Sequence, residues 1–184
     1  MLLREKTTIM DGVEINQVLN RLAAEIVEQS QEILLVGIHR RGVPLAKRLL
    51  EKINNLGNSN TSLATIDISF YQEDLTPLAE QPIFKEFDCP INDLSNKDIV
   101  LIDDVIYSGR TILTAINEIM QKGLPNKITL AVLIDRGHRR FPIRPDYSGK
   151  LVPTRRSEHI KVMLEEIDGE DKVLIMEVEN DGQN

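Results

Sequence analysis

The hydrophobic positions of this chain follow two periods, one typical of helices and one typical of strands. Residues 13–29 repeat apolar side chains at helical spacing, which predicts a packing helix with a single apolar face. Short continuous apolar runs at 32–38, 98–102 and 127–134 are typical of strands buried on both faces. Residues 63–70 alternate apolar and polar side chains, which predicts a half-buried strand.

Helical patterns separate these strands. Residues 43–53 form one pattern, in which Pro44 suits a first helical turn, and a second runs from about Thr111 to Lys122 and ends at Gly123. Buried strands that alternate with helices predict one α/β domain with a central, mostly parallel sheet flanked by helices. Two late strand-like runs, HIKVML and KVLIMEV, predict a smaller appendage.

The segment 71–96 has no sustained period, contains three prolines and is rich in acidic residues. A segment of this length without regular structure inside a compact domain is usually a lid or is disordered. We therefore expect a loop here.

Composition places the chain among ordinary globular proteins. It has 184 residues, 41% of them hydrophobic and 28% charged, which is enough for one stable core. No apolar run approaches the roughly 20 residues that cross a bilayer, and we find no export signal. The single Cys89 cannot form an intrachain disulfide, so a cytoplasmic protein is the simplest expectation.

Charge is sorted along the chain. The net charge of -7 argues against a general nucleic-acid binder. Residues 136–161 are nevertheless strongly basic, whereas residues 165–181 are acidic. This asymmetry leaves room for a local basic surface that binds an anionic ligand.

The stretch VLIDDVIYSGRT, residues 100–111, carries the most specific chemistry. Asp103 and Asp104 follow a buried strand, where neither carboxylate is cheaply buried, and ligands of open α/β sheets bind at the carboxyl ends of strands. The following turn offers backbone amides before a helix, and Gly109 permits a positive φ, which together suit a phosphate dianion. Two carboxylates beside a phosphate site predict a ribose 5-phosphate. The alternative is an exposed Asp-Asp turn with Ser and Gly as ordinary turn formers.

This stretch resembles the phosphoribosyl pyrophosphate (PRPP) motif of the type I phosphoribosyltransferases. Most of the chain also resembles the pyrimidine operon attenuation proteins with uracil phosphoribosyltransferase activity, the PyrR family. The matching pieces are LVGIHRRGVPLAKRL (35–49), TIDISFYQEDL (65–75) and VLIDRGHRRFPIRPDYSGKLVPTRRSEHIKV (132–162). The resemblance implies a single type I phosphoribosyltransferase domain over residues 1–184, with a small base-binding hood mainly at about 136–160.

The resemblance also implies a reaction: uracil and PRPP give UMP and pyrophosphate, with Mg²⁺ held mainly by oxygens of the substrate. It implies catalytic roles for Asp103, Asp104 and Arg41, and a mobile catalytic loop at 70–85, in which Gln72 replaces an arginine common in relatives. The residues that it implies for PRPP binding are Arg40, Arg41, Gly42, Asp103, Asp104, Val105, Ile106, Tyr107, Ser108, Gly109, Arg110 and Thr111.

For the base, the resemblance implies contacts from Asp135, Arg136, His159 and Ile160. A purine phosphoribosyltransferase with a shared hood is an alternative. The family also implies a homodimer or higher oligomer.

A second function, in another class, is UMP-responsive binding of pyrimidine operon leader RNA. In the family it uses a basic face made by the first helix and the region after DRG, because phosphates bind Lys and Arg. The candidate residues here are Arg21, His138, Arg139, Arg140, Arg144, Lys150, Arg155 and Arg156. The first helix contributes little positive charge, since only Arg21 remains, so an enzyme without RNA binding, with these arginines solvated or in a subunit contact, stays open.

Overall fold

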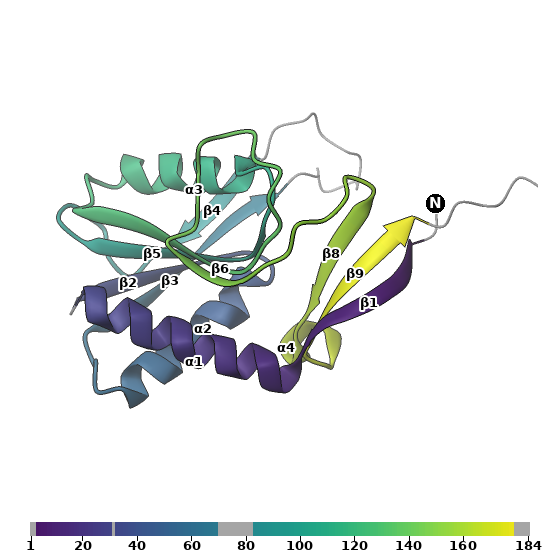
Figure 1. The fold of residues 1–184 in the computed structure, drawn as a ribbon. Helices are drawn as coiled ribbons and strands as arrows, with labels where there is room; N and C mark the ends of the chain where they lie inside the picture. The colour runs from purple at the N-terminus through teal and green to yellow at the C-terminus, as the bar shows by residue number, and fades with distance from the viewer. Residues whose placement is uncertain (1–2, 31, 70–82, 179–184) are drawn as a thin grey trace, which may run out of the picture.

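The computed structural model describes residues 3–30, 32–69 and 83–178, which form two sheets with flanking helices (Figure 1). The elements are, in chain order, β1 (Leu3–Asp11), α1 (Gly12–Gln29), β2 (Ile33–Ile38), α2 (Gly42–Asn55), β3 (Thr61–Ser69), β4 (Ile83–Asp88), β5 (Asp98–Ile106), α3 (Arg110–Gln121), β6 (Lys127–Asp135), β7 (Tyr147–Leu151), β8 (Glu158–Met163), α4 (Glu165–Asp168) and β9 (Lys172–Val178). Within these ranges, no helix is long and apolar enough to span a bilayer.

The larger sheet has six strands in the order β4-β3-β2-β5-β6-β7. All neighbours pair in parallel except β3 and β4, which confirms the prediction of a mostly parallel sheet. β2 pairs with β3, the next strand in the chain, on one side and with β5 on its other side. The sheet therefore has a topological switch point between the carboxyl ends of β2 and β5, where ligands of such folds bind.

Alternate side chains of the central strands feed two cores. On β2, Leu35 joins a cluster with α1 and α2, while Leu34 and Val36 join a cluster with α3. Helices cover both faces of the sheet, as the continuous apolar runs predicted (Figure 1).

A separate three-stranded antiparallel sheet has the order β1-β9-β8. The sequence pattern did not predict β1, because its residues are mostly exposed and polar and the strand depends on pairing with the distant β9. The residues expected to form a separate hood, about 136–160, are divided between the two sheets. Residues 147–151 form β7 of the main sheet, and only 158–160 enter the small sheet.

The expectation of a loop over 71–96 is wrong for residues 83–88, which form the antiparallel edge strand β4. A register shift opposite Asp67 and Ile68 brings Phe84 and Phe87, three residues apart, onto the same core cluster. This bulge breaks the period of two that identifies a strand in sequence. Residues 70–82, including Gln72, lie outside the described residues.

The strand β5 is longer than predicted. The apolar run suggested residues 98–102, but β5 continues to Ile106, and its later residues pair with β6 through Asp103 and Val132 and through Val105 and Ile134. The two carboxylates therefore lie within the strand, and backbone pairing with β6 carries the strand past their charges.

Candidate active site

The turns after β2 and near the end of β5 approach each other closely at the switch point. A Cβ built on Gly42, the first residue of α2, would lie 2.4 Å from the carbonyl oxygen of Ile102 and 3.3 Å from the Cα of Asp103. A side chain at this position would therefore push the two strands apart. The glycine lets the turn at 39–41 lie directly beside the carboxylates.

The turn between β5 and α3 ends at the amino terminus of a twelve-residue helix. Gly109 precedes it with φ of 87°, in the left-handed region that favours glycine. The Ser108 hydroxyl accepts a hydrogen bond from the Arg110 amide at 3.4 Å. Backbone amides and the positive end of the helix dipole thus make this turn suitable for an anion.

Asp103 and Asp104 are half-buried next to that turn. The Asp103 Oδ1 accepts a hydrogen bond from the Asp104 amide, and the Asp104 Oδ1 accepts one from the Val105 amide, both at 2.9 Å. Burial and the charge of Asp104 raise the pKa of Asp103 well above its usual value. Burial also raises the pKa of Asp104, although the hydrogen bond with Asp103 and the charge of Arg41 oppose that rise. The pair therefore resists carrying two negative charges without a ligand.

Arg41 joins this pair to α4, the short helix between strands β8 and β9 of the small sheet. It ends the turn after β2, and its charge acts on Asp104, while its guanidinium donates to the Asp168 carboxylate of α4 at 2.8 Å. Burial would raise the pKa of Asp168, but hydrogen bonds from Arg41 and from the Leu164 amide hold it below its usual range. Arg40, the other arginine of the turn, is exposed. Sequence reasoning found Arg41 and missed Asp168.

Arg136, a candidate for contact with the base, is buried and packs against Tyr107 of the turn. Its guanidinium carbon lies 4.2 Å from the Tyr107 ring centroid, and its Nε donates to the Thr154 hydroxyl at 2.8 Å. The same guanidinium donates to the Glu158 carbonyl at the start of β8. Arg136 therefore connects the turn after β5 with the small sheet.

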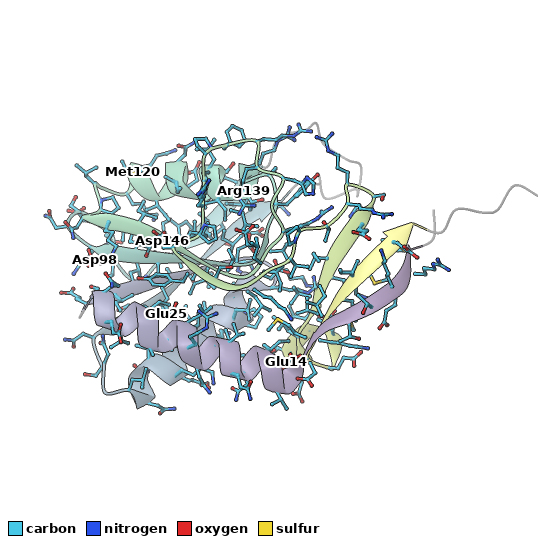
Figure 2. The ribbon with its side chains drawn as sticks, viewed as in Figure 1. Glu14, Glu25, Asp98, Met120, Arg139 and Asp146 are labelled. Carbon is cyan, nitrogen blue, oxygen red and sulfur yellow. The ribbon has the colours of Figure 1, made fainter. Side chains whose placement is uncertain are left out.

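Arg139, a candidate for RNA contact, is also used within the protein (Figure 2). Its guanidinium donates to the Tyr107 carbonyl at 3.0 Å and the Ile143 carbonyl at 2.9 Å, and pairs with the Asp135 carboxylate at 2.6 Å. The Asp135 Oδ1 also accepts the Gly137 amide at 2.9 Å. Arg139 and Asp135 thus fasten the segment after β6 to the phosphate-type turn.

His159 and Ile160 are neighbours on β8, so their side chains lie on opposite faces of the small sheet. Ile160 packs against the core cluster of α1 and α2, whereas His159 is exposed. The His159 ring is therefore turned away from the core.

The other RNA candidates are all exposed, and three of them also make contacts within the protein. Arg21 donates to the Ser148 and Gly149 carbonyls of β7 at 2.9 and 3.0 Å, and Lys150 donates to the Ile9 carbonyl at 3.0 Å. The His138 Nε2 lies 2.6 Å from the Thr154 carbonyl oxygen. Arg140, Arg144, Arg155 and Arg156 are exposed as well.

An acidic groove lies between the C-terminal end of α1 and the first residues of β6 and β7. It has a volume of about 320 Å³ and is lined partly by Glu25 and Glu28 of α1 and by Asp146 before β7. Glu25 and Asp146 are labelled in Figure 2. Carboxylates in this position repel a phosphate backbone, so the C-terminal end of α1 is poorly suited to hold RNA.

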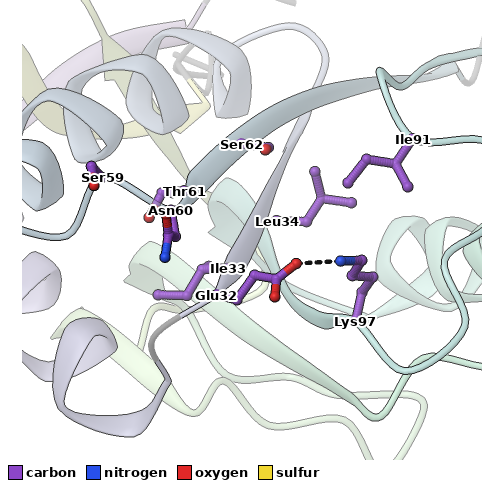
Figure 3. A pocket seen from close by; sticks show the side chains of 9 residues that line it. All are labelled: Glu32, Ile33, Leu34, Ser59, Asn60, Thr61, Ser62, Ile91 and Lys97. Atoms are coloured by element: carbon purple, nitrogen blue, oxygen red, sulfur yellow. Dashed lines mark hydrogen bonds and ion pairs between the residues drawn. The ribbon is translucent and has the colours of Figure 1, made fainter.

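A further groove of about 440 Å³ lies at the amino ends of β2 and β3 in the main sheet (Figure 3). It is lined by the first residues of β2 and β3, and an ion pair between Glu32 and Lys97 crosses it. Because ligands of parallel sheets bind at the carboxyl ends of strands, we place the functional site at the carboxyl ends of β2 and β5 and not in this groove.

Comparison with known proteins agrees with this geometry. The family model of the phosphoribosyl transferase domain matches residues 6–166. The bifunctional protein PyrR of Pelotomaculum thermopropionicum is 49% identical over 177 residues, which cover 95% of this chain and 97% of that protein. The bifunctional protein PyrR of Deinococcus radiodurans is 42% identical over 178 residues, which cover 95% and 97%. This chain belongs to the PyrR proteins of the phosphoribosyl transferase family.

Solved structures support the family fold. A hypoxanthine phosphoribosyltransferase from Staphylococcus aureus aligns with a TM-score of 0.70 at 18% identity and covers 92% of both chains. One from Trypanosoma cruzi aligns with a TM-score of 0.74 at 15% identity, covering 94% of this chain and 91% of that one. The expected phosphoribosyltransferase fold is thus confirmed.

The raised pKa of Asp103 generates a stability prediction. In the unfolded chain the carboxylate ionises near pH 4. In the folded protein the pKa of Asp103 is higher, so ionising it there lowers the free energy of unfolding. This loss of stability is absent below about pH 4, grows as the pH rises, and reaches its full size above the folded pKa. Asp103→Asn should therefore raise Tm more at pH 8 than at pH 5. A gain of about 1 kcal/mol corresponds to roughly 2–4 °C for a protein of this size.

Thermal unfolding followed by circular dichroism measures the effect. Asp88→Asn, on the exposed edge strand β4, controls for the loss of one negative charge. A fall in Tm of Asp103→Asn that is equal at both pH values would show that the ionised carboxylate stabilises the fold.

Proposed function

We propose that this protein transfers the 5-phosphoribosyl group of PRPP to uracil, giving UMP and pyrophosphate. The observation that carries the proposal is the meeting of three features at one edge of the sheet. These are the arginine turn after β2, the carboxylates of β5 and the amino terminus of α3. Their charges match the three parts of PRPP: a pyrophosphate, a diol and a 5-phosphate.

In this proposal each part of PRPP has its own protein contacts. Amides and hydroxyls of residues 106–111 hold the 5-phosphate at the helix terminus. Asp103 and Asp104 accept hydrogen bonds from the ribose hydroxyls, which offsets the cost of their burial. The turn of Arg40, Arg41 and Gly42 holds the pyrophosphate, for which a guanidinium is a strong donor.

The chemistry occurs at C1′ of the ribose. The uracil N1 forms a bond to C1′, the bond from C1′ to the pyrophosphate oxygen breaks, and the N1 proton is released. The transition state resembles an oxocarbenium ion, so nearby carboxylates stabilise its positive charge. Arg41 stabilises the negative charge that develops on pyrophosphate.

The site also fits a magnesium ion carried by the substrate. In the described part of the chain, no group of three or more His, Cys, Asp or Glu side chains is arranged to hold a metal. Two adjacent carboxylates with raised pKa values would accept a cation close by, and Mg²⁺ needs few protein ligands when phosphates supply its oxygens. Bound Mg²⁺ would neutralise the leaving pyrophosphate; oxygens of PRPP would supply most of its ligands, and Asp103 and Asp104 are the side chains that would complete its coordination.

For the base, the resemblance of the region after β6 to the PyrR family favours uracil. We place base recognition between the end of β6 and β8, through main-chain groups near Ile160 rather than through the His159 ring. The position of Ile160 at the junction of the small sheet and the core supports this choice.

A panel of bases tests the proposed reaction. With PRPP and Mg²⁺, the purified protein should use uracil with a kcat/KM at least about 100-fold above those for hypoxanthine and guanine. A pocket built to hydrogen-bond one base leaves polar groups unpaired with another. Release of pyrophosphate measures turnover. Preference for a purine would overturn the assignment to uracil while keeping a PRPP-dependent transferase.

We further propose that the protein binds pyrimidine operon leader RNA in response to UMP. The exposed arginines at 140, 144, 155 and 156 support this second function, because they lie in or near the segment that packs on the phosphate-type turn. The Arg140 amide donates to the Ser108 carbonyl at 3.0 Å, so UMP in the site and RNA on the surface would share one loop. The carboxylates of the acidic groove beside α1 repel RNA phosphates, so in this proposal the RNA contacts the loop that carries Arg140 and not the end of α1.

Titration with leader RNA at several salt concentrations, with and without UMP, tests the second function. Arg144→Gln should weaken RNA binding and reduce the salt slope by about 1, because one phosphate contact is lost, while UMP affinity stays unchanged. Lys85→Gln, on the edge strand farthest from β7, is the matched charge control. If UMP makes no difference to RNA binding by the unaltered protein, the protein acts as an enzyme only.

A further inference from the structure

The acidic segment between β8 and β9 contacts α2 at two places. Arg41, at the start of α2, donates to Asp168, and Arg48, seven residues later, donates to Glu166 and Asp171. Seven residues are about two helical turns, so both arginines lie on one side of α2, roughly 10 Å apart along its axis. Figure 1 shows α4 where the small sheet meets α1 and α2.

The two contacts differ in their distance from the reaction. Arg48 lies two turns into the helix, and its carboxylate partners hold α4 against α2. Arg41 lies in the turn that we assign to pyrophosphate, and its charge acts on Asp104. The Arg48 contact therefore only joins α2 to the segment between β8 and β9, whereas the Arg41 contact also reaches the site.

The geometry of the Arg41 contact leaves part of the guanidinium available. The Nη2 donates to Asp168 Oδ1 at 2.8 Å and to Oδ2 at 3.1 Å, and the Nε donates to Oδ2 at 3.3 Å. Within the described residues, the protein thus occupies one edge of the guanidinium and leaves Nη1 for a ligand. A guanidinium is planar and rigid, so fixing one edge also fixes the direction of the Nη1 hydrogens.

Asp168 is itself held in place. Its Oδ2 accepts the Leu164 amide at 3.0 Å, its side chain is 15% exposed, and its own amide donates to the Leu164 carbonyl at 2.7 Å. The Arg41 side chain is 26% exposed. A carboxylate fixed by the backbone of its own turn is a firm support for a side chain on another element.

We propose that Asp168 is a positioning residue that orients Arg41 to receive the pyrophosphate group of PRPP. It acts through Arg41 and does not touch the substrate. The inference rests on the proposed function of the turn after β2. It predicts an effect specific to ligands that carry pyrophosphate, because UMP lacks that group.

The test compares Asp168→Asn with Glu166→Gln, which weakens the Arg48 contact between the same two elements. Asp168→Asn should raise the KM for PRPP and the inhibition constant of pyrophosphate about tenfold, with the Kd for UMP unchanged within twofold. Glu166→Gln should leave all three constants unchanged. Asn keeps an oxygen for the Leu164 amide, and Asp168→Glu, which keeps the charge, should recover part of the PRPP affinity.

A double-mutant cycle checks that the effect passes through Arg41. In an Arg41→Gln background, Asp168→Asn should add less than a twofold further change in the KM for PRPP. Tm values of all variants report whether they fold.

Three results would overturn the inference. One is an equal change in Asp168→Asn and Glu166→Gln, which would make the contact purely structural. Another is tighter PRPP binding by Asp168→Asn, which would mean that Asp168 competes with pyrophosphate for Arg41. The third is a matching loss of UMP affinity. Failure of the unaltered protein to consume PRPP would instead overturn the proposed function.

Discussion

Two carboxylates side by side in a buried strand impose the constraint around which this site is built. Desolvation and mutual repulsion make both charges costly, and β5 carries them because pairing with β6 continues past them. The surroundings supply positive potential: Arg41 lies close to Asp104, and α3 begins six residues beyond Asp104, after the next turn. A protein partner would satisfy the carboxylates permanently, whereas the proposed ribose and magnesium do so only when substrate is bound.

The order of the strands brings these groups together. The turns after β2 and β5 each lead into a helix, and the switch point makes those turns neighbours. Gly42 lets them approach, and the buried arginine Arg136 ties the second turn to the small sheet. The site is thus assembled from the carboxyl end of β5 and the two adjoining turns; Arg41 connects the first turn to α4, and Arg136 connects the second turn to the small sheet.

The periodicity of the sequence predicted α1, α2, α3 and the parallel strands β2, β3, β5 and β6, because their apolar patterns are local. It did not predict β1, β4 or β7. β1 depends on a partner at the other end of the chain, a bulge breaks the pattern of β4, and β7 lies in a stretch rich in Pro, Gly and Arg. The carboxylates and the phosphate-type turn were predictable because they are contiguous. The contact between Arg41 and Asp168 was not, because 127 positions separate the two residues and only the fold brings them together. Strand alternation places the His159 ring on the exposed face of β8, and its contact with the base stays a prediction.

Asp103 and Asp104 are retained, in this proposal, for the ribose of PRPP. Isothermal titration of PRPP with Mg²⁺ into the Asp103→Asn, Asp104→Asn double variant measures this claim. We expect the variant to remain folded and to lose detectable PRPP binding, because both acceptors for the ribose hydroxyls lose their charge. PRPP binding with the affinity of the unaltered protein would contradict the account.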